Sequence, residues 1–252
     1  MPLDVQRVQN LRPQNPIHYF SSIPSTMTEA ARLAHEGASH GTVVIAEEQT
    51  AGLGRLGRKW TSEAEVGIYS STLLRLPLPL QQFPLISLLL ALAAAHAIQK
   101  SAPPLTCDLR WPNDVLINEN KVAGILPHLV DNCIVAGIGI NVNNTAFEPG
   151  LRTPATSLKI AMGGRDVSRE TLLVNLLESI DTFSHALISD GPQSILDAFT
   201  QASSYVTNRK FLIEDSGVRG ITAGLDENGF LLLRSEKGKL ERVAAGGVRP
   251  AA

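Results

Sequence analysis

The sequence predicts an α+β fold, in which helices pack on a largely antiparallel sheet and a small β-barrel ends the chain. Four short apolar runs between residues 106 and 140 follow one another at the spacing of antiparallel hairpins. Longer apolar segments with helical periodicity separate other strand-like runs. Beyond Arg209, four short strand-like runs alternate with glycine-containing turns, as in an SH3-like barrel. We therefore expect a main domain over residues 1–206 and a small SH3-like domain over residues 207–252.

Size and charge restrict the class of protein. The chain has 252 residues, of which 44% are hydrophobic and 18% charged, as in an ordinary globular protein. Its formal net charge of −2 argues against a general nucleic-acid-binding surface, so we expect no DNA partner. Cys107 and Cys133 are too few for a disulfide scaffold and too far apart for a metal site. Their apolar surroundings predict small buried residues.

Two segments bear on the location of the protein. The first fifteen residues are polar and lack the apolar stretch of a signal peptide, and prolines at positions 2, 13 and 16 predict a poorly ordered lead-in. The run from Leu85 to Ile98 is the most apolar of the chain, but it is shorter than the ~20 residues of a membrane span. We expect this run to form a buried helix, and we expect a cytoplasmic protein with no membrane partner.

The individual elements follow from periodicity and end signals. Thr26 with Glu29 fits a capping box at the start of a helix that Gly37 ends, and Ser168 is expected to cap a later amphipathic helix. The expected strands are residues 17–20, 42–45, 66–75, 106–111, 115–117, 121–129, 133–140, 211–213, 218–222, 230–233 and 240–244. The expected helices begin near residues 25, 83, 168 and 193.

The stretch from Thr42 to Trp60 carries the first functional signal. After the apolar strand come three glycines at close intervals, with Arg55 and Arg58 between them. Glycine lets backbone N–H groups approach a ligand, and arginine binds carboxylate or phosphate in a bidentate way. We interpret this stretch as an anion-binding loop that orders around its ligand. A mobile surface loop with solvated arginines is the plain alternative.

The spacing of the three glycines also matches the dinucleotide-binding pattern G-x-G-x-x-G. That pattern needs a helix to begin inside it, with its N-terminus on the pyrophosphate. Here the next regular element is the strand at residues 66–75. A Rossmann oxidoreductase is therefore disfavoured.

A second cluster lies between residues 110 and 141. Pro112 forces a corner at which Asn113 and Asp114 are presented, although Asn-Asp is also ordinary turn chemistry. Lys121 opens an otherwise apolar strand, either as a solvated strand end or as a cation that reaches the same pocket as Arg55. Gly137 and Gly139 share one face of a strand. A face without side chains leaves room for a flat ligand ring or for a crossing helix.

Together these motifs resemble the biotin protein ligase family, the enzymes that attach biotin to carboxylase carrier domains. The glycine loop from Gln49 to Trp60 is similar to the family's biotinyl-adenylate-binding loop. The later segments R-W-P-N-D-V (residues 110–115), K-V-A-G-I-L (121–126) and G-I-G-I-N-V (137–142) resemble family motifs in the same order. The resemblance implies a biotin/lipoate ligase-like catalytic domain with a mixed, largely antiparallel sheet.

The resemblance also implies an activity and a set of site residues. Biotin and ATP would give biotinyl-5′-AMP, with Mg²⁺ and without a tightly bound organic cofactor, and a lysine of a biotin carboxyl carrier protein would accept the biotinyl group. The implied catalytic cations are Lys121, Arg55 and Arg58, and Asp114 is the implied magnesium ligand. Implied biotin-binding residues are Ser25, Thr26, Met27, Gln49, Gly52, Leu53, Gly54, Arg55, Lys121, Gly124, Leu126, Gly137 and Gly139. Implied nucleotide-binding residues are Arg55, Arg58, Asn113, Lys121 and Asn141.

The chain departs from the family pattern at three positions. The family often has arginine at the position of Leu53, lysine at that of Arg110 and asparagine at that of Met27. The residues before Ile17 leave no room for the family's winged-helix DNA-binding domain, so a ligase-only class is expected. For this fold class a homodimer is also expected. Two alternatives stay open: a lipoate or octanoate ligase of the same fold, and a non-catalytic biotin-binding protein.

Overall fold

The computed structural model describes residues 1–213, 219–235, 238–243 and 248–250, and its larger unit is a seven-stranded sheet. The strand order is β1-β2-β3-β7-β6-β5-β4. The strands are β1 (Ile17–Ile23), β2 (Val43–Gln49), β3 (Gly67–Leu74), β4 (Asp108–Arg110), β5 (Asp114–Ile117), β6 (Asn120–Val130) and β7 (Cys133–Asn141). β1 and β2 pair in parallel through the crossover helix α2 (Thr26–His35), and every other neighbouring pair is antiparallel. The prediction of a mixed, largely antiparallel sheet is confirmed.

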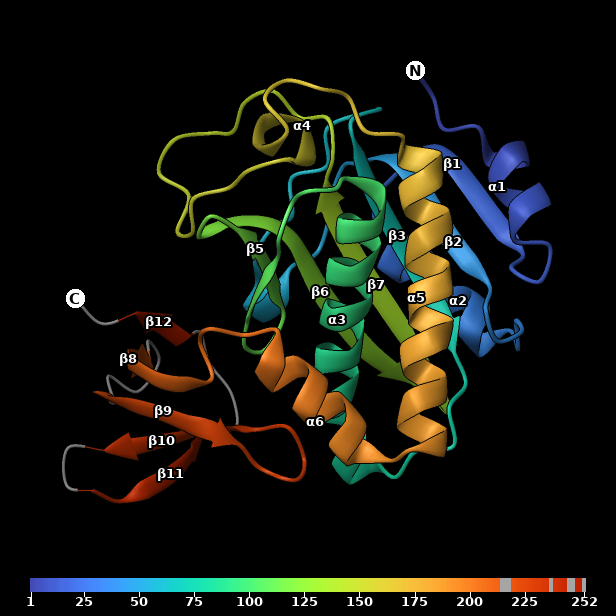
Figure 1. The fold of residues 1–252 in the computed structure, drawn as a ribbon. Coiled ribbons are helices and arrows are strands. Elements are labelled where there is room, and N and C mark those ends of the chain that lie inside the picture. Colours follow the sequence, from blue (N-terminus) through green and yellow to red (C-terminus); the bar gives the residue numbers. More distant parts are fainter. Residues whose placement is uncertain (214–218, 236–237, 244–247, 251–252) are drawn as a thin grey trace.

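Helices cover both faces of this sheet (Figure 1). On one face, α3 (Phe83–Ser101) packs with α5 (Arg169–Ser189) and α6 (Pro192–Gln201) over a large apolar core. On the other face, α2 packs on β2, β3 and β7 around a smaller cluster that contains Met27, Leu73 and Val135. Shorter helical turns are η1 (Arg55–Gly57), η2 (Leu80–Gln82) and α4 (Leu158–Ala161).

The apolar run near residue 90 forms a core helix, as predicted. The segment Leu80–Ser101 is long and apolar enough to cross a membrane by length and composition alone. In this protein, α3 buries twelve of its side chains between the sheet and helices α5 and α6. Burial inside a protein core explains its composition, because a helix that is apolar all round needs apolar neighbours on every side.

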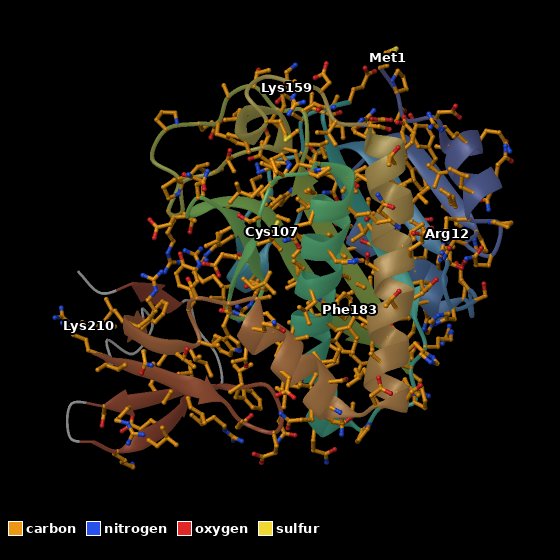
Figure 2. The ribbon with its side chains drawn as sticks, in the orientation of Figure 1. Met1, Arg12, Cys107, Lys159, Phe183 and Lys210 are labelled. Carbon is orange, nitrogen blue, oxygen red and sulfur yellow. The ribbon has the colours of Figure 1, made fainter. Side chains whose placement is uncertain are left out.

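The N-terminal lead-in was predicted to be poorly ordered, and this prediction is wrong. Residues 5–11 form α1 (Val5–Leu11), whose N-cap Asp4 accepts a hydrogen bond from the backbone of Arg7. Arg12, which is labelled in Figure 2, is buried near the end of α1. It pairs with Asp181 of α5 and donates to Asn15 Oδ1 at 2.9 Å. These contacts fix a proline-containing segment that composition alone suggested was loose.

The four predicted helix starts are correct to within one residue, but one of the two predicted caps is wrong. Ser168 caps α5 by accepting a hydrogen bond from the backbone of Thr171, as expected. At α2, however, Ser25 occupies the N-cap and Thr26 is the first helical residue. The Thr26 hydroxyl turns away from the helix and contacts Gln49 and Ser71 instead. The expected capping box is therefore absent, because this hydroxyl takes part in a tertiary network.

A second sheet follows α6, and within the described part of the chain it contains five strands, one more than predicted. Its order is β11-β10-β9-β8-β12, and all its pairs are antiparallel. The strands are β8 (Thr207–Ile213), β9 (Arg219–Leu225), β10 (Leu231–Ser235), β11 (Leu240–Val243) and β12 (Val248–Pro250). The predicted turn at Gly217 lies outside the described residues.

The second sheet packs directly on the main unit. Phe211, Leu231 and Leu233 belong to the same apolar core as α3. The indole Nε1 of Trp111 donates to the carbonyl of Gly229, in the turn between β9 and β10, at 2.9 Å. Of the two cysteines, both unpaired, Cys133 is buried in β7 and Cys107 is half-buried before β4. The division at residue 206 remains a proposal, since one continuous core crosses it.

Candidate active site

Two adjacent cavities lie beside the sheet, and the narrower one is on the face that carries α2. A narrow pocket of about 50 Å³ lies between α2, the glycines of β6 and β7, and the glycine loop. A wide cavity of about 710 Å³ lies between that loop, the corner before β5 and residues 144–155. The two cavities share five lining residues: Gly54, Arg55, Trp60, Asn113 and Lys121. We call these five residues the junction. A small ring-containing ligand in the narrow pocket and a nucleotide in the wide cavity could therefore meet there.

The glycines of the narrow pocket make room for protein side chains. A β-carbon placed on Gly124 would lie 2.7 Å from the ring of Trp60, and one on Gly139 would lie 2.6 Å from its Nε1. A β-carbon on Gly137 would collide with the thioether of Met27, on α2. The interpretation of a crossing helix thus holds at Gly137, and the indole of Trp60 occupies the space beside Gly124 and Gly139. A ligand ring on this face remains a prediction.

Hydroxyl and amide groups form the polar side of the narrow pocket. Gln49 Oε1 accepts from the backbone of Thr26 at 2.8 Å and from its hydroxyl at 3.1 Å. Thr26 Oγ1 also lies 2.9 Å from Ser71 Oγ, and Gln49 Nε2 donates to Ser62 Oγ at 2.9 Å. Ser25 is buried and its hydroxyl has no protein partner. This network fixes donors and acceptors that can recognise a ligand of mixed polarity.

The glycine loop is folded as a small hairpin over the junction. Trp60 N donates to Gly52 O at 2.9 Å, and Gly54 N donates to Arg58 O at 2.7 Å. Leu56 turns the chain with φ 58°. Gly52 is buried and lines neither cavity, and a β-carbon there would overlap the carbonyl oxygen of Trp60. The hairpin shows that the loop has a defined backbone structure of its own.

Three cations of the site are held by two neighbouring residues of the Pro112 corner. Arg55 Nη1 donates to Asn113 Oδ1 at 3.1 Å. Lys121 Nζ and Arg110 Nη2 each lie 2.5 Å from a different oxygen of Asp114. Burial acts to raise the pKa of Asp114, but the charges and hydrogen bonds of Lys121 and Arg110 outweigh it and hold that pKa below its ordinary value. The corner therefore keeps an ionised carboxylate beside the junction.

Asp114 does not fit the role of a magnesium ligand. Both of its oxygens are already paired with cations. Over residues 1–213, 219–235, 238–243 and 248–250, no three His, Cys, Asp or Glu side chains come together to hold a metal ion. A nucleotide can instead bring Mg²⁺ on its own phosphates, where the ion keeps several waters. We therefore assign Asp114 to the placement of Lys121.

The wide cavity combines basic and apolar side chains. Exposed Arg58 lines it together with Arg110 and Trp111. Asn141 also lines it, with its amide nitrogen bonded to the carbonyl of Thr156 at 3.1 Å. Sequence reasoning missed several lining or supporting residues, which are Ser62, Ser71, Glu63, Phe147, Leu151 and Thr153. Ser71 had a signal, since hydroxyl residues at 70–72 interrupt an apolar strand, but the loop residues had none.

The structure thus brings together most of the residues implied by the resemblance. The narrow pocket is lined by Thr26, Met27, Gln49, Leu53, Gly54, Arg55, Lys121, Gly124, Leu126, Gly137 and Gly139. Arg58 and Asn141 lie on the wide cavity, away from the narrow pocket's lining, and Asn113 lies on both. Their individual roles remain proposals.

Comparison with known proteins agrees with this geometry. Residues 19–144 match the biotin/lipoate A/B protein ligase family. A bifunctional ligase/repressor BirA of Bacillus spizizenii is 35% identical over 229 residues, which cover 87% of this chain and 70% of the relative. A biotin–[acetyl-CoA-carboxylase] ligase of Mycobacterium tuberculosis is 34% identical over 224 residues, covering 86% of this chain and 82% of the relative.

The fold is also found among solved structures. A biotin protein ligase from Aquifex aeolicus, in complex with biotin and ATP, superposes with a TM-score of 0.82 at 29% identity. The alignment covers 94% of this chain and 99% of that one. Since both the sequence match and the superposition span the sheet that carries the two cavities, the chain belongs to the biotin/lipoate A/B protein ligase family.

Proposed function

We propose that the protein activates biotin with ATP to biotinyl-5′-AMP and transfers the biotinyl group to a lysine of a biotin carboxyl carrier protein. One observation carries the proposal: Arg55 and Lys121 line both the narrow pocket and the wide cavity. A carboxylate at the end of the first and a phosphate at the start of the second would meet between these two cations. The relatives that are named biotin ligases support the choice of substrates.

The first reaction joins the two substrates. A carboxylate oxygen of biotin forms a bond to the α-phosphorus of ATP, and the bond from that phosphorus to the bridging oxygen of pyrophosphate breaks. Arg55 and Lys121 stabilise the negative charge that gathers at this phosphorus, because fixed cations in a partly dry site need no reorganisation. Arg58, on the wide cavity, is placed for the departing phosphates. Mg²⁺ enters with ATP as part of the substrate.

The second reaction needs no covalent enzyme intermediate. The neutral amine of the acceptor lysine attacks the carbonyl carbon of the mixed anhydride, AMP leaves with the electrons of the broken C–O bond, and the amine gives up one proton to water. The hairpin over the junction lowers access of water to this anhydride. The chain therefore contributes mainly position, charge and exclusion of water.

Biotin is favoured over lipoate by the polar side of the narrow pocket. Thr26, Gln49 and Ser71 form a connected set of hydroxyl and amide groups there. A ureido group offers two donors and one acceptor to such a set, whereas the dithiolane ring of lipoate offers neither. A non-catalytic binder is disfavoured because Arg58 on the wide cavity adds a third cation to Arg55 and Lys121, whereas biotin alone carries a single carboxylate. A cytoplasmic location and a homodimer remain predictions.

The test combines calorimetry with mass spectrometry of the bound small molecule. The protein is titrated with biotin, then with ATP and Mg²⁺, and the mass of the extracted ligand is measured. Biotinyl-AMP would support the proposal, and release of labelled AMP on addition of a carrier domain would complete it. Biotin without adenylate would point to a non-catalytic binder. Failure to bind biotin, with binding of lipoate or octanoate, would contradict the choice of substrate.

A further inference from the structure

We propose that Arg110 is a positioning residue for the nucleotide. Its side chain links the outer wall of the wide cavity to the Asp114–Lys121 pair. We call residues 144–155 the cavity wall. The inference rests on the proposed function, because it assigns the wide cavity to ATP. The residue stands where the family often has lysine, so the arrangement is a property of this chain.

The contacts of Arg110 run in two directions. Its Nη2 lies 2.5 Å from Asp114 Oδ2 and 2.8 Å from Thr153 Oγ1. Only 12% of the Arg110 side chain is exposed, so solvent competes weakly for these bonds. One terminal nitrogen carries two N–H groups and can serve both acceptors at once. Arg110 thus joins the end of β4 to the cavity wall.

The cavity wall is attached to the sheet at the same place. Lys121 N donates to Pro154 O at 2.7 Å, and Thr156 N donates to Lys121 O at 2.9 Å. At its start the wall is held by Ser157 Oγ, which donates to Asn144 O at 2.6 Å. Between these attachments the wall has no strand and no helix in the described structure. Its course over the cavity therefore depends on how firmly both ends are held.

The wall carries apolar side chains that suit the flat face of a purine. Ala146, Phe147 and Leu151 line the cavity, and Leu151 is 43% exposed. Burying such a surface against a base is favourable only if the wall is already in position, because ordering it on binding costs free energy. By holding Thr153, Arg110 prepares this surface before ATP arrives. Its side chain acts on the wall and on Asp114, so we assign it no direct chemical step.

Four variants test the inference: Thr153→Val, Thr153→Ser, Arg110→Lys and the double variant Arg110→Lys with Thr153→Val. Valine keeps the shape of threonine without its hydroxyl, and serine keeps the hydroxyl. Lysine keeps a positive charge near Asp114, but replaces the fixed fork of donors with one flexible ammonium group. The readouts are biotin-dependent ATP–pyrophosphate exchange and calorimetric affinity for a non-hydrolysable ATP analogue, with thermal unfolding of each variant.

We expect Thr153→Val to raise KM for ATP about fivefold, the effect of one lost hydrogen bond, with kcat and KM for biotin unchanged. Thr153→Ser should restore KM for ATP. The double variant should resemble the worse single variant, because both substitutions break the same contact. If Thr153→Val does not fold, Thr153→Ala serves in its place.

Several results would overturn the inference. These are an unchanged KM for ATP in Thr153→Val, an equal rise in KM for biotin, or effects of the two single substitutions that multiply in the double variant. The affinity for the ATP analogue separates this failure from failure of the proposed function. If the parent protein has no exchange activity, the proposed function is contradicted. The affinities of parent and variants for the ATP analogue can still be compared, and they test the role of Arg110 separately.

Discussion

Lys121 Nζ lies 2.5 Å from Asp114 Oδ1, and Arg110 Nη2 lies 2.5 Å from the other oxygen of the same carboxylate. One anion thus serves two cations, and the three side chains together carry one excess positive charge. The carboxylate reduces the cost of bringing both cations into a half-buried site, while the excess charge remains available to a phosphate. This relationship determines what substitution of each partner should do.

We expect Lys121→Ala to lower kcat/KM for adenylate formation about 10²–10³-fold, as is typical when a fixed charge is removed from a reacting centre. The fold should survive, because Asp114 keeps its pairing with Arg110. Biotin-dependent ATP–pyrophosphate exchange and thermal unfolding measure the two effects. Arg32→Ala, which removes an exposed cation on α2, is the control and should leave exchange intact. Undiminished exchange in Lys121→Ala would refute the assignment.

Asp114→Asn should instead affect stability in a pH-dependent way. The pKa of Asp114 is lowered in the folded protein, so its ionisation stabilises the fold above its ordinary pKa of 3.8. That contribution is lost as the pH falls through the lowered folded pKa. At pH 7 the variant leaves two cations without their anion, and we expect a loss of about 3 kcal/mol.

Urea unfolding of the parent and of Asp114→Asn at a series of pH values checks this prediction. The two free energies of unfolding should converge only below the ordinary carboxyl range, since protonation then removes the same charge from the parent. A difference that stays constant down to pH 3 would mean that the charge of Asp114 does not cause it.

The glycine loop gives a prediction about backbone space. A β-carbon on Gly52 would overlap Trp60 O, whereas one on Gly54 would lie 3.2 Å from Arg58 O. We expect Gly52→Ala to open the hairpin and to speed the release of biotinyl-AMP at least tenfold, because a backbone atom cannot move aside cheaply. Gly54→Ser should speed release only about twofold, since its backbone is extended and its neighbour must shift only slightly. Stopped-flow or filter-binding assays measure the rate of adenylate release from each variant. Equal rates for Gly52→Ala and Gly54→Ser would refute this prediction.

Much of the fold could be predicted from the sequence because local signals agree with the tertiary structure. The four short apolar runs predicted the hairpins of β4–β7, and the continuous apolar run at residues 85–98 predicted α3. The N-terminal segment was mispredicted because long-range partners order it, as Asp181 does for Arg12. The cap at α2 was mispredicted for the same reason, since Gln49 and Ser71 redirect the hydroxyl of Thr26.

The candidate site was predictable to the extent that its residues lie in motifs. Glycines and cations at fixed spacing indicated the loop and Lys121, and the structure brings them together. Nothing local distinguishes Phe147, Leu151 or Thr153 from other loop residues. Their part in the site comes from the backbone bonds between Lys121 and residues 154–156, which pair segments about thirty positions apart.

Met27 and Gly137 offer a test of the inner end of the narrow pocket. A β-carbon on Gly137 would collide with the sulfur of Met27 and would lie 3.1 Å from its Cγ. We expect Gly137→Ala to raise KM for biotin at least tenfold, because the thioether must then move into the pocket. Met27→Ala alone should cost about 2 kcal/mol of stability through the space it leaves.

The double variant, Gly137→Ala with Met27→Ala, should recover KM for biotin to within about threefold of the Met27→Ala value, because the new methyl group enters the space left by the thioether. Leu33→Ala, in the same apolar cluster on α2 but outside the pocket lining, is the matched control and should leave the Gly137→Ala defect uncorrected. Exchange kinetics at varied biotin concentration measure each KM. Equal recovery by Met27→Ala and Leu33→Ala would show a general loosening of α2. Recovery with Met27→Ala but not with Leu33→Ala would show that the Met27 side chain contacts residue 137. That contact would then mark the inner limit of the pocket for the ring of the substrate.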